Sequence, residues 1–378
     1  MNIKYILSHP IQYQSPLINF LTKKGLKIKV LFRSDMSTRK YFDTQFKKKI
    51  SWGTNLLDGF DYEYLNYVGP NKVDAIFPLT TDFTNKIIEK DTDIIWLHGI
   101  KNWYNLCIIF IAKIFNKKVF IRDEANHFSK KRSFLNKIFN YFFYKFIDSF
   151  IDIYLAIGSQ NKKYYLDHNI KNKKIVIVPY TVDNNFFNKK KKIKKNQKLT
   201  YIFAAKLIKK KGANILLEAV NILNRNQKFY HNSEFLIIGD GYMKNSLQSY
   251  VKLKNLKNVK FIPFQNQNKL SKIYQKSDVF IIPSLYEPWG LTVNEAMAAE
   301  NAIISSNAVA SSYDLISNNV NGFRFKNGDS KDLANKILKI FKNRKKIRKY
   351  QSSSLKIISK WNFNQCFLGI QKAISKCR

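Results

Sequence analysis

Residues 281–300 have the sequence IIPSLYEPWGLTVNEAMAAE, and this stretch decides the fold. An apolar run of strand length is followed by a loop that contains Pro288 and Gly290, and a helical pattern begins near Leu291. A strand that leads through a short loop into a helix is typical of a βαβ unit. Glu287 lies in the predicted loop and Glu295 one turn into the predicted helix, so two carboxylates lie near a helix start.

The same alternation of short apolar runs and longer helical patterns continues along the chain. Predicted strands cover residues 3–7, 27–32, 93–97, 118–122, 153–157 and 175–178, and then 199–204, 234–238, 259–262, 279–282 and 302–305. Helical patterns lie between many of them. This order predicts an α/β protein with two Rossmann-like, doubly wound domains that face each other across a cleft. Ligands of such sheets bind at the carboxyl ends of the strands.

The domain boundaries follow from a break in this pattern. Residues 186–198, FFNKKKKIKKNQK, have almost no apolar periodicity, and we predict that they are a basic linker. An arm that contacts DNA is the alternative. We therefore expect an N-terminal Rossmann-like domain at 1–185, a C-terminal Rossmann-like domain at 199–358, and a final helix at 359–378 that packs back on the first domain.

Composition narrows the partners. The net charge is +40, from 66 Lys and Arg against 26 Asp and Glu, and such a field favours anionic partners. Nucleic acid, an anionic membrane surface and a phosphorylated ligand are all candidate partners. The alternative is that the charge reflects a general compositional bias toward Lys and no particular partner. The basic residues are spread along the whole chain, whereas a nucleic-acid-binding element would concentrate them, so we expect no nucleic acid partner.

Cysteine content and hydropathy bear on localisation. There are three Cys and no CxxC pair, which fits a reducing compartment, and residues 1–24 lack a signal-peptide pattern. No apolar run approaches the roughly 20 residues of a membrane span. We expect a cytoplasmic protein, with the inner face of the cell membrane as a candidate location.

A second cluster lies at residues 201–212, YIFAAKLIKKKG, where a basic loop leads to a helix start. Lys206 and Lys211 beside that start favour a diphosphate clamp. Carboxylates accept hydrogen bonds from hydroxyls, so Glu287 suits a sugar and Glu295 suits a ribose. The alternative is that Glu295 only complements the helix dipole. GxGxxG, P-loop, HExxH and GxSxG motifs are absent, and without an Asp-x-Asp at a suitable strand end we expect no metal and no cofactor.

Across residues 199–340 the motifs AAKLIKKKG, IIGDG, VKFIPF, YQKSDVFIIPS, EPWGLTVNEAMA and NGFRF follow one another. In this order they resemble the family-4 retaining glycosyltransferases of the GT-B fold. The resemblance implies that Glu287 contacts the transferred sugar as a catalytic residue and that two cations neutralise the leaving diphosphate. The donor-binding set it implies is Lys206, Lys211, Gly239, Phe264, Gly290, Leu291, Thr292 and Glu295. Where the family usually has Gly-Arg-Leu this chain has Ala205-Lys206-Leu207, which loses the bidentate fork of Arg.

The first half resembles a subset of the same family that begins with a strand and HPIQYQ, here residues 9–14. His9, His98 in WLHG, and four residues of IRDEANH come at predicted strand ends: Arg122, Asp123, Glu124 and His127. We predict catalytic roles for His98 and Glu124 and cleft positions for the other four. A structural role is the alternative for each His. The basic loop at 130–132 is a candidate contact for an anionic lipid carrier or membrane.

The resulting hypothesis is a metal-independent, retaining transferase that moves a sugar from a UDP- or GDP-linked donor. The resemblance implies that the domain at 1–185 binds the acceptor and that the domain at 199–358 binds the nucleotide sugar. It also implies a lipid-linked or cell-surface glycan precursor as acceptor, and front-side attack as the route. The alternatives are a basic nucleic-acid-binding protein, a non-catalytic GT-B protein, and an epimerase or phosphorylase of the same fold.

Overall fold

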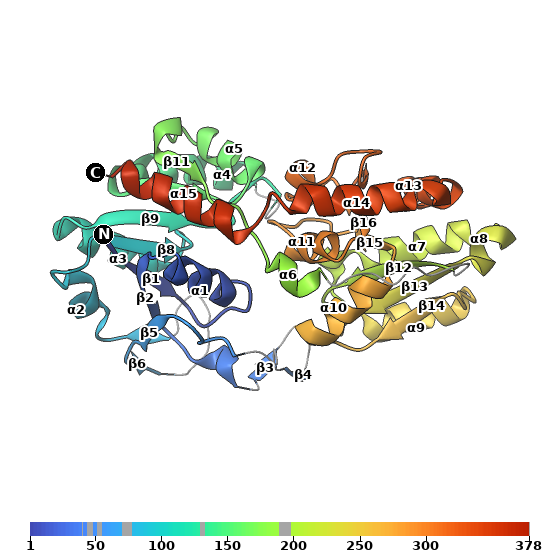
Figure 1. Cartoon of the computed structure of the whole chain (residues 1–378), viewed down its shortest axis with the longest axis horizontal. Helices are drawn as coiled ribbons and strands as arrows, with labels where there is room; N and C mark the ends of the chain where they lie inside the picture. The colour runs from blue at the N-terminus through green and yellow to red at the C-terminus, as the bar shows by residue number, and fades with distance from the viewer. Residues whose placement is uncertain are drawn as a thin grey trace. The chain divides into compact units, whose positions relative to one another are not determined.

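The computed structural model describes residues 1–39, 41–43, 48–50, 55–69, 78–128, 133–188 and 198–377. The chain divides into two compact units (Figure 1). The N-terminal unit comprises Met1–Tyr41, Thr54–Thr181 and Asn362–Arg378, and the C-terminal unit comprises Phe42–Gly53 and Val182–Trp361. Most of the predicted linker (189–197) and the basic loop at 130–132 lie outside the described residues.

The N-terminal unit is built on a seven-stranded sheet in the order β11-β10-β9-β8-β1-β2-β5, in which all neighbours are parallel. Its strands are β1 (Asn2–Leu7), β2 (Lys27–Phe32), β5 (Asp61–Tyr64), β8 (Ile94–His98), β9 (Lys118–Arg122), β10 (Ile153–Ala156) and β11 (Ile175–Ile177). Short strands β3 (Tyr41–Asp43) and β4 (Lys48–Ile50) form one pair, and β6 (Tyr67–Val68) and β7 (Leu79–Thr80) form another.

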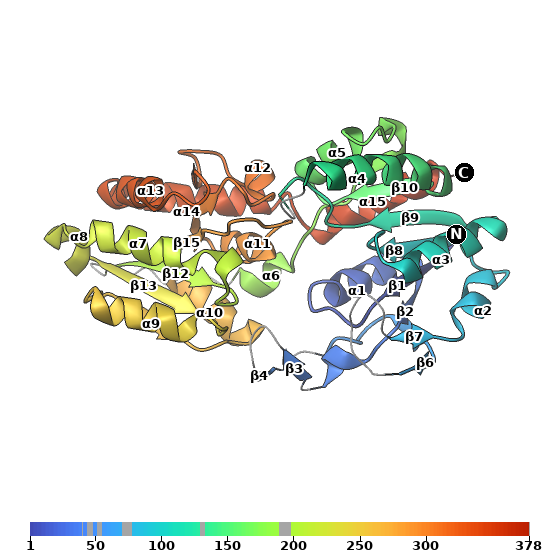
Figure 2. The same ribbon diagram turned by 180° about the vertical axis from the view of Figure 1, so that it is seen from behind.

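Alternate residues of these strands enter two separate cores, because side chains of a strand point to opposite faces. One core joins Ile95 and Leu97 to α3 (Trp103–Ile114), α4 (Phe134–Ile147) and α5 (Ser159–Leu166). The other joins Ile94 and Trp96 to α1 (Ser15–Lys23) and α15 (Phe363–Ser375). Figures 1 and 2, which are opposite views, show α1 and α15 on one face of the sheet and α3 and α4 on the other. The last helix therefore packs on the N-terminal unit.

The C-terminal unit has a six-stranded parallel sheet in the order β14-β13-β12-β15-β16-β17. The strands are β12 (Leu199–Ala204), β13 (Ser233–Ile238), β14 (Val259–Ile262), β15 (Val279–Ile282), β16 (Ala302–Ser306) and β17 (Gly322–Phe325). The helices of this unit are α6 (Asn184–Phe187), α7 (Ala213–Leu223), α8 (Gln227–His231), α9 (Lys244–Leu253), α10 (Gln267–Lys276), α11 (Leu291–Ala298), α12 (Ser312–Leu315), α13 (Ser330–Lys342) and α14 (Ile347–Ile358).

Both sheets confirm the predicted doubly wound α/β class, and each has one point where the strand order reverses. In the N-terminal unit the reversal lies between β1 and β8, and in the C-terminal unit it lies between β12 and β15. The loops that leave such a pair of strands diverge to opposite faces and open a crevice at the carboxyl ends. The topology alone therefore directs attention to residues after β1, β8, β12 and β15.

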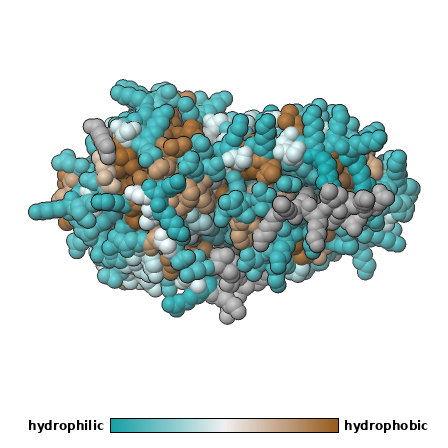
Figure 3. All heavy atoms as spheres, viewed as in Figure 1, coloured by the Kyte–Doolittle hydropathy of each residue, from teal (hydrophilic) through white to brown (hydrophobic). Residues whose placement is uncertain are grey.

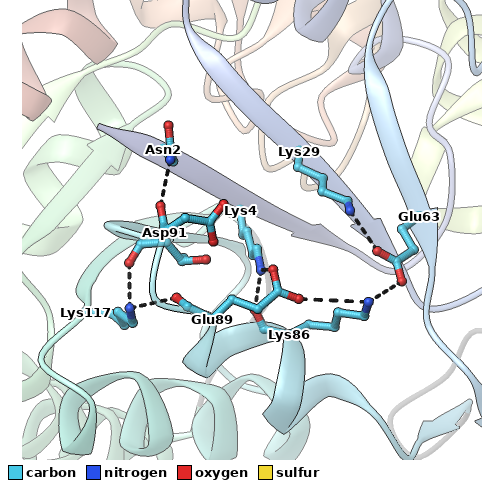
Figure 4. Close-up of polar contacts among 9 residues, drawn as sticks. Asn2, Lys4, Lys29, Glu63, Lys86, Glu89, Asp91 and Lys117 are labelled. Carbon is cyan, nitrogen blue, oxygen red and sulfur yellow. Dashed lines mark hydrogen bonds and ion pairs between the residues drawn. The ribbon is translucent and has the colours of Figure 1, made fainter.

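The amino end of the first sheet is held by charged side chains (Figure 4). Lys4 of β1 pairs with Glu89, and Glu63 of β5 pairs with Lys86 of α2 (Phe83–Ile88) at 2.6 Å and with Lys29 at 3.0 Å. These pairs border an open hollow of about 570 Å³. Because the hollow lies at the amino ends of the strands, and Lys4, Lys29 and Glu89 of its lining are held in ion pairs, we interpret it as structural.

Candidate functional site

The candidate donor site lies at the strand-order reversal of the C-terminal unit, where two loops pack against each other. The loop after β12 carries Lys206 and Lys211, and the loop after β15 carries Glu287. The amide of Leu285 donates a 2.8 Å hydrogen bond to the carbonyl of Lys210. A side chain at Gly212, whose φ is +70°, would place its Cβ 2.1 Å from the carbonyl oxygen of Pro283, so only Gly permits this approach.

Lys211 and Glu287, far apart in sequence, form an ion pair through Nζ and Oε2. The hydroxyl of Ser284 donates to the same Oε2 at 3.4 Å. The Glu287 side chain is 11% exposed and that of Lys211 is 19% exposed, so both are largely withdrawn from water. The backbone of both residues is held as well, because the amide of Glu287 donates to the carbonyl of Ala308 at 3.0 Å and the amide of Lys211 donates to the carbonyl of Ile208 at 3.0 Å.

The first turn of α11 borders this pair. Gly290 caps the helix with φ +92°, and a Cβ there would lie 3.3 Å from Cγ of Glu287. Leu291 and Thr292 form the first turn, whose amides have no partner within the helix, so they are available to a phosphate or a sugar oxygen. The cation, the carboxylate and the helix start thus lie together, as a site for an anionic, hydroxylated ligand requires.

Glu295 is held deeper in the unit. It is 8% exposed and accepts a 3.3 Å hydrogen bond from the hydroxyl of Tyr274 on α10. Burial raises the pKa of Glu295 to about 7, although the Tyr274 hydrogen bond opposes the shift. The carboxyl group is therefore poised between its neutral and its ionised form near neutral pH.

Lys206 pairs with Asp43 of β3 at 2.9 Å, a carboxylate that sequence reasoning missed.

Asp240, which sequence reasoning also missed, links the loop that contains Gly239 to the loops after β12 and β14. Its carbonyl accepts from the amide of Leu207 at 2.9 Å, and its carboxylate accepts from the amide of Phe264 at 2.8 Å. The only sequence signal for Asp240 was its place in the Gly-Asp-Gly turn, and Asp43 had none.

A second group lies at the strand-order reversal of the N-terminal unit and consists of buried, mostly neutral side chains. His98 ends β8, and its Nε2 lies 3.1 Å from the hydroxyl of Tyr180, while its Nδ1 lies 3.4 Å from the hydroxyl of Tyr5. Burial lowers the pKa of His98 to about 3, and the positive charge of Arg122 adds to this shift. His98 is therefore a neutral imidazole at physiological pH.

His9 and Glu124 lie close to this group. Burial lowers the pKa of His9 to about 4, and its Nδ1 lies 2.9 Å from the hydroxyl of Ser8. Burial raises the pKa of Tyr13 to about 12, and the negative charge of Glu124 adds to that shift. Tyr13 in turn packs against Tyr180, with ring centroids 5.6 Å apart. The tyrosines were missed as functional candidates, although Tyr13 lies within the HPIQYQ motif.

The remaining predicted cleft residues take other positions. Arg122 is 1% exposed and donates a 2.8 Å hydrogen bond to the carbonyl of Pro179, so it fixes the chain before Tyr180. Asp123 is buried and accepts a 2.6 Å hydrogen bond from the hydroxyl of Tyr165 on α5. His127 lies at the surface, 2.9 Å from Asp167. The described contacts of Asp123 and His127 thus run to α5 and its end, apart from the His98 group.

Comparison with solved structures identifies the fold. Solved structures that align over the whole chain are HepE of Anabaena in complex with UDP and sucrose-phosphate synthase of Thermosynechococcus elongatus. The alignment with HepE covers 99% of this chain and 100% of HepE, with a TM-score of 0.74 and 15% identity. The alignment with sucrose-phosphate synthase covers 100% of this chain and 99% of the synthase, with a TM-score of 0.74 and 16% identity. The fold is that of the GT-B glycosyltransferases, as predicted.

The family comparison concerns the C-terminal unit. Residues 184–356 match the model of the family Glycosyl transferases group 1. The chain is 35% identical over 123 residues to the uncharacterized glycosyltransferase MJ1607 of Methanocaldococcus jannaschii, which is 32% of this chain and 30% of the relative. It is 28% identical over 174 residues to the amylovoran biosynthesis glycosyltransferase AmsK of Erwinia amylovora, 44% and 42% of the two chains. The chain thus spans less than half the length of these two relatives.

Proposed function

We propose that the protein is a retaining glycosyltransferase that moves a sugar from a UDP- or GDP-linked donor to a hydroxyl group of a glycan or lipid-linked acceptor. The observation that carries the proposal is the meeting of Lys211, Glu287 and the first turn of α11 at the strand-order reversal. The match of 184–356 to the glycosyltransferase family model covers these residues. HepE is named as a complex with UDP, and AmsK by a role in amylovoran biosynthesis, which supports a nucleotide-sugar donor and a polysaccharide or its precursor as acceptor.

In the proposed reaction the acceptor oxygen bonds to the anomeric carbon as the bond from that carbon to the phosphate oxygen breaks. The departing oxygen takes the acceptor proton on the same face, so the configuration is retained and the products are a glycoside and a nucleoside diphosphate. The negative charge that develops on the phosphate needs stabilisation. Lys206, Lys211 and the amides of the first turn of α11 supply it, without a metal ion.

The carboxylates take the hydroxyl groups of the donor. Glu287 accepts from the transferred sugar, and Glu295 accepts from the ribose, because a carboxylate offers several acceptor sites. In the N-terminal unit, neutral His98 and Glu124 orient the acceptor hydroxyl. Before the donor binds, Glu287 neutralises Lys211, and this ion pair must open to release both groups to the substrate.

The test measures binding and slow hydrolysis of a panel of nucleotide sugars by the wild type, Glu287→Ala and Glu295→Ala. We expect one donor class to bind and release its nucleoside diphosphate, and hydrolysis by Glu287→Ala to fall by about 100-fold or more. Glu218→Ala, an exposed carboxylate on α7, is the matched control. Equal turnover by all variants, or no binding of any nucleotide sugar at moderate salt, would contradict the proposal. The anomeric configuration of the product, read by NMR, tests retention.

A further inference from the structure

Helix α4 has apolar side chains on both of its sides. One side is buried in the core of the N-terminal unit through Tyr144 and Ile147. The other side carries a stripe of six exposed residues, and the exposed fractions are 76% for Phe134, 77% for Leu135, 40% for Ile138, 69% for Phe139, 60% for Phe142 and 60% for Phe146. Spacings of three and four residues place them along one face of the helix. Folding of the described residues leaves this face in water.

The stripe continues onto α3. Phe110 packs on Phe146 with ring centroids 6.4 Å apart, and Ile114, one turn further along α3, is 73% exposed. Figure 2 shows α3 and α4 together on the face of the unit turned toward the viewer. By contrast, the face in Figure 3 is mostly hydrophilic, with hydrophobic residues in smaller patches. An exposed apolar surface of this extent is typical of an interaction site.

The charges beside the stripe indicate what it binds. Lys137 and Lys145 are exposed along one edge of it, and the sequence of α4, FLNKIFNYFFYKFI, contains no acidic residue. Asp148, which follows the helix, is neutralised by Lys174 at 3.0 Å. A second copy of this face would offer no acidic residue of α4 to these lysines, because a two-fold interface pairs identical patches.

An aromatic stripe edged by lysines instead fits an anionic lipid surface. We propose that α4, with the end of α3, docks the protein onto an anionic bilayer, with the helix axis parallel to the surface. Among the described residues no helix is long and apolar enough to cross a membrane. The inference rests on α3 and α4 alone and does not depend on the donor site.

The test is flotation of the full chain with vesicles of phosphatidylcholine, and of phosphatidylcholine with 30 mol% phosphatidylglycerol, at about 0.1 M salt. We expect binding to the anionic vesicles, a decrease of about tenfold or more in the partition coefficient for the double variant Phe139→Ser/Phe142→Ser, and a smaller decrease for Lys137→Gln/Lys145→Gln. The matched control is Leu253→Ser/Leu368→Ser, which removes two leucines that are 78% and 48% exposed on other helices. It should bind like the wild type.

Three results would overturn the proposal. The first is equal loss in the control, and the second is full binding by the Phe variant, which would show attraction by net charge alone. The third is that the wild type does not bind to the vesicles, whether it is monomeric or forms a dimer that the Phe variant abolishes. Unchanged thermal midpoints and unchanged nucleotide-sugar binding show that the variants are folded, so failure here is distinguishable from failure of the proposed transferase.

Discussion

The two units have their candidate residues at equivalent positions of the fold, but these residues differ in charge. Each places its candidate residues where the strand order of a parallel sheet reverses, after β12 and β15 in one unit and after β1 and β8 in the other. In the C-terminal unit these residues are charged, and in the N-terminal unit they are mostly neutral and buried. The difference fits the proposed function, in which one unit binds a charged, leaving diphosphate and the other an uncharged hydroxyl group.

The electrostatics of the two groups support this division. Lys211 and Lys206 are cations with side chains that are 19% and 27% exposed, and in the proposed reaction phosphate oxygens replace their present partners, Glu287 and Asp43. His98 cannot serve as a cation near neutral pH, because burial and Arg122 lower its pKa to about 3. Variants in the two units should therefore separate donor binding from transfer to the acceptor.

The largest expected effect is in the C-terminal unit. Lys211→Gln removes the cation that we propose stabilises the leaving diphosphate, and it also leaves Glu287 without its ion-pair partner. We expect kcat for donor hydrolysis to fall by about 100- to 1,000-fold, since such a group acts mainly on the transition state. Steady-state assays of nucleoside diphosphate release check this.

Lys209→Gln is the matched control, because Lys209 is exposed on the same turn. It should keep the wild-type rate. If Lys209→Gln and Lys211→Gln lost the same activity, the general positive field of the loop would explain the result, and the specific role of Lys211 would be wrong.

The N-terminal unit should show the opposite behaviour. Tyr180→Phe removes the hydroxyl 3.1 Å from Nε2 of His98 and leaves a buried ring nitrogen unsatisfied. A cost of about 2 kcal/mol for such a loss corresponds to a decrease of about 30-fold in transfer to the acceptor. Donor affinity, measured by calorimetry, should stay at the wild-type value.

Tyr201→Phe serves as its control, since Tyr201 is equally buried, in the core of the other unit. A loss of donor affinity in Tyr180→Phe would contradict the division of labour between the units. Wild-type transfer by Tyr180→Phe would exclude His98 and Tyr180 from the acceptor step.

The strands were largely predictable because most are buried on both faces and therefore form unbroken apolar runs. β2, β9, β12, β14 and β15 have the predicted bounds. β5 was missed because its sequence, DYEY, belongs to an edge strand that is half exposed and has no apolar run. β17 was recognised only as the motif NGFRF, because it is short and Arg324 interrupts it.

The sites were predictable where a loop motif carries charge, and not where tertiary contacts select the partner. The motifs singled out Lys206, Lys211 and Glu287, but the pairing of Lys206 with Asp43 depends on a segment far away in sequence. The tyrosines around His98 could not be singled out among 21 in the chain. In helix α4, which of the apolar residues stay exposed is decided only by packing.

A third prediction concerns pH. Because burial raises the pKa of Glu295 to about 7, this carboxyl is mostly protonated at pH 6 and mostly ionised at pH 8. The ionised form is the better acceptor for ribose hydroxyls, so affinity for the donor should increase by about tenfold as the pH rises from 6 to 8. Calorimetry with an intact nucleotide sugar, whose diphosphate does not titrate in this range, checks the direction.

Glu295→Gln should bind the donor with an affinity that does not change over the same range. A pH dependence that persists in this variant would assign the titration to another group.

The stability of the fold provides an independent check of the raised pKa of Glu295. The raised pKa favours the protonated form in the folded state, so this group's contribution to stability is complete below about pH 4.5 and is lost as the pH rises toward 7. The thermal midpoint of Glu295→Gln should therefore exceed that of the wild type at pH 8 more than at pH 5.

The smallest expected effect comes from Lys206→Arg, which restores the residue that the resembling family usually has at this position. Lys206 offers a point charge and already pairs with Asp43 at 2.9 Å. An Arg can hold Asp43 and still present a second N–H to a phosphate oxygen, because its donors form a rigid fork. We expect the affinity for the donor to increase by about two- to fivefold, with kcat unchanged. The control variant Lys209→Arg, at an exposed position, should change neither the donor affinity nor kcat. A weaker donor affinity in Lys206→Arg would contradict the prediction and would mean that the loop after β12 accommodates Lys better than Arg.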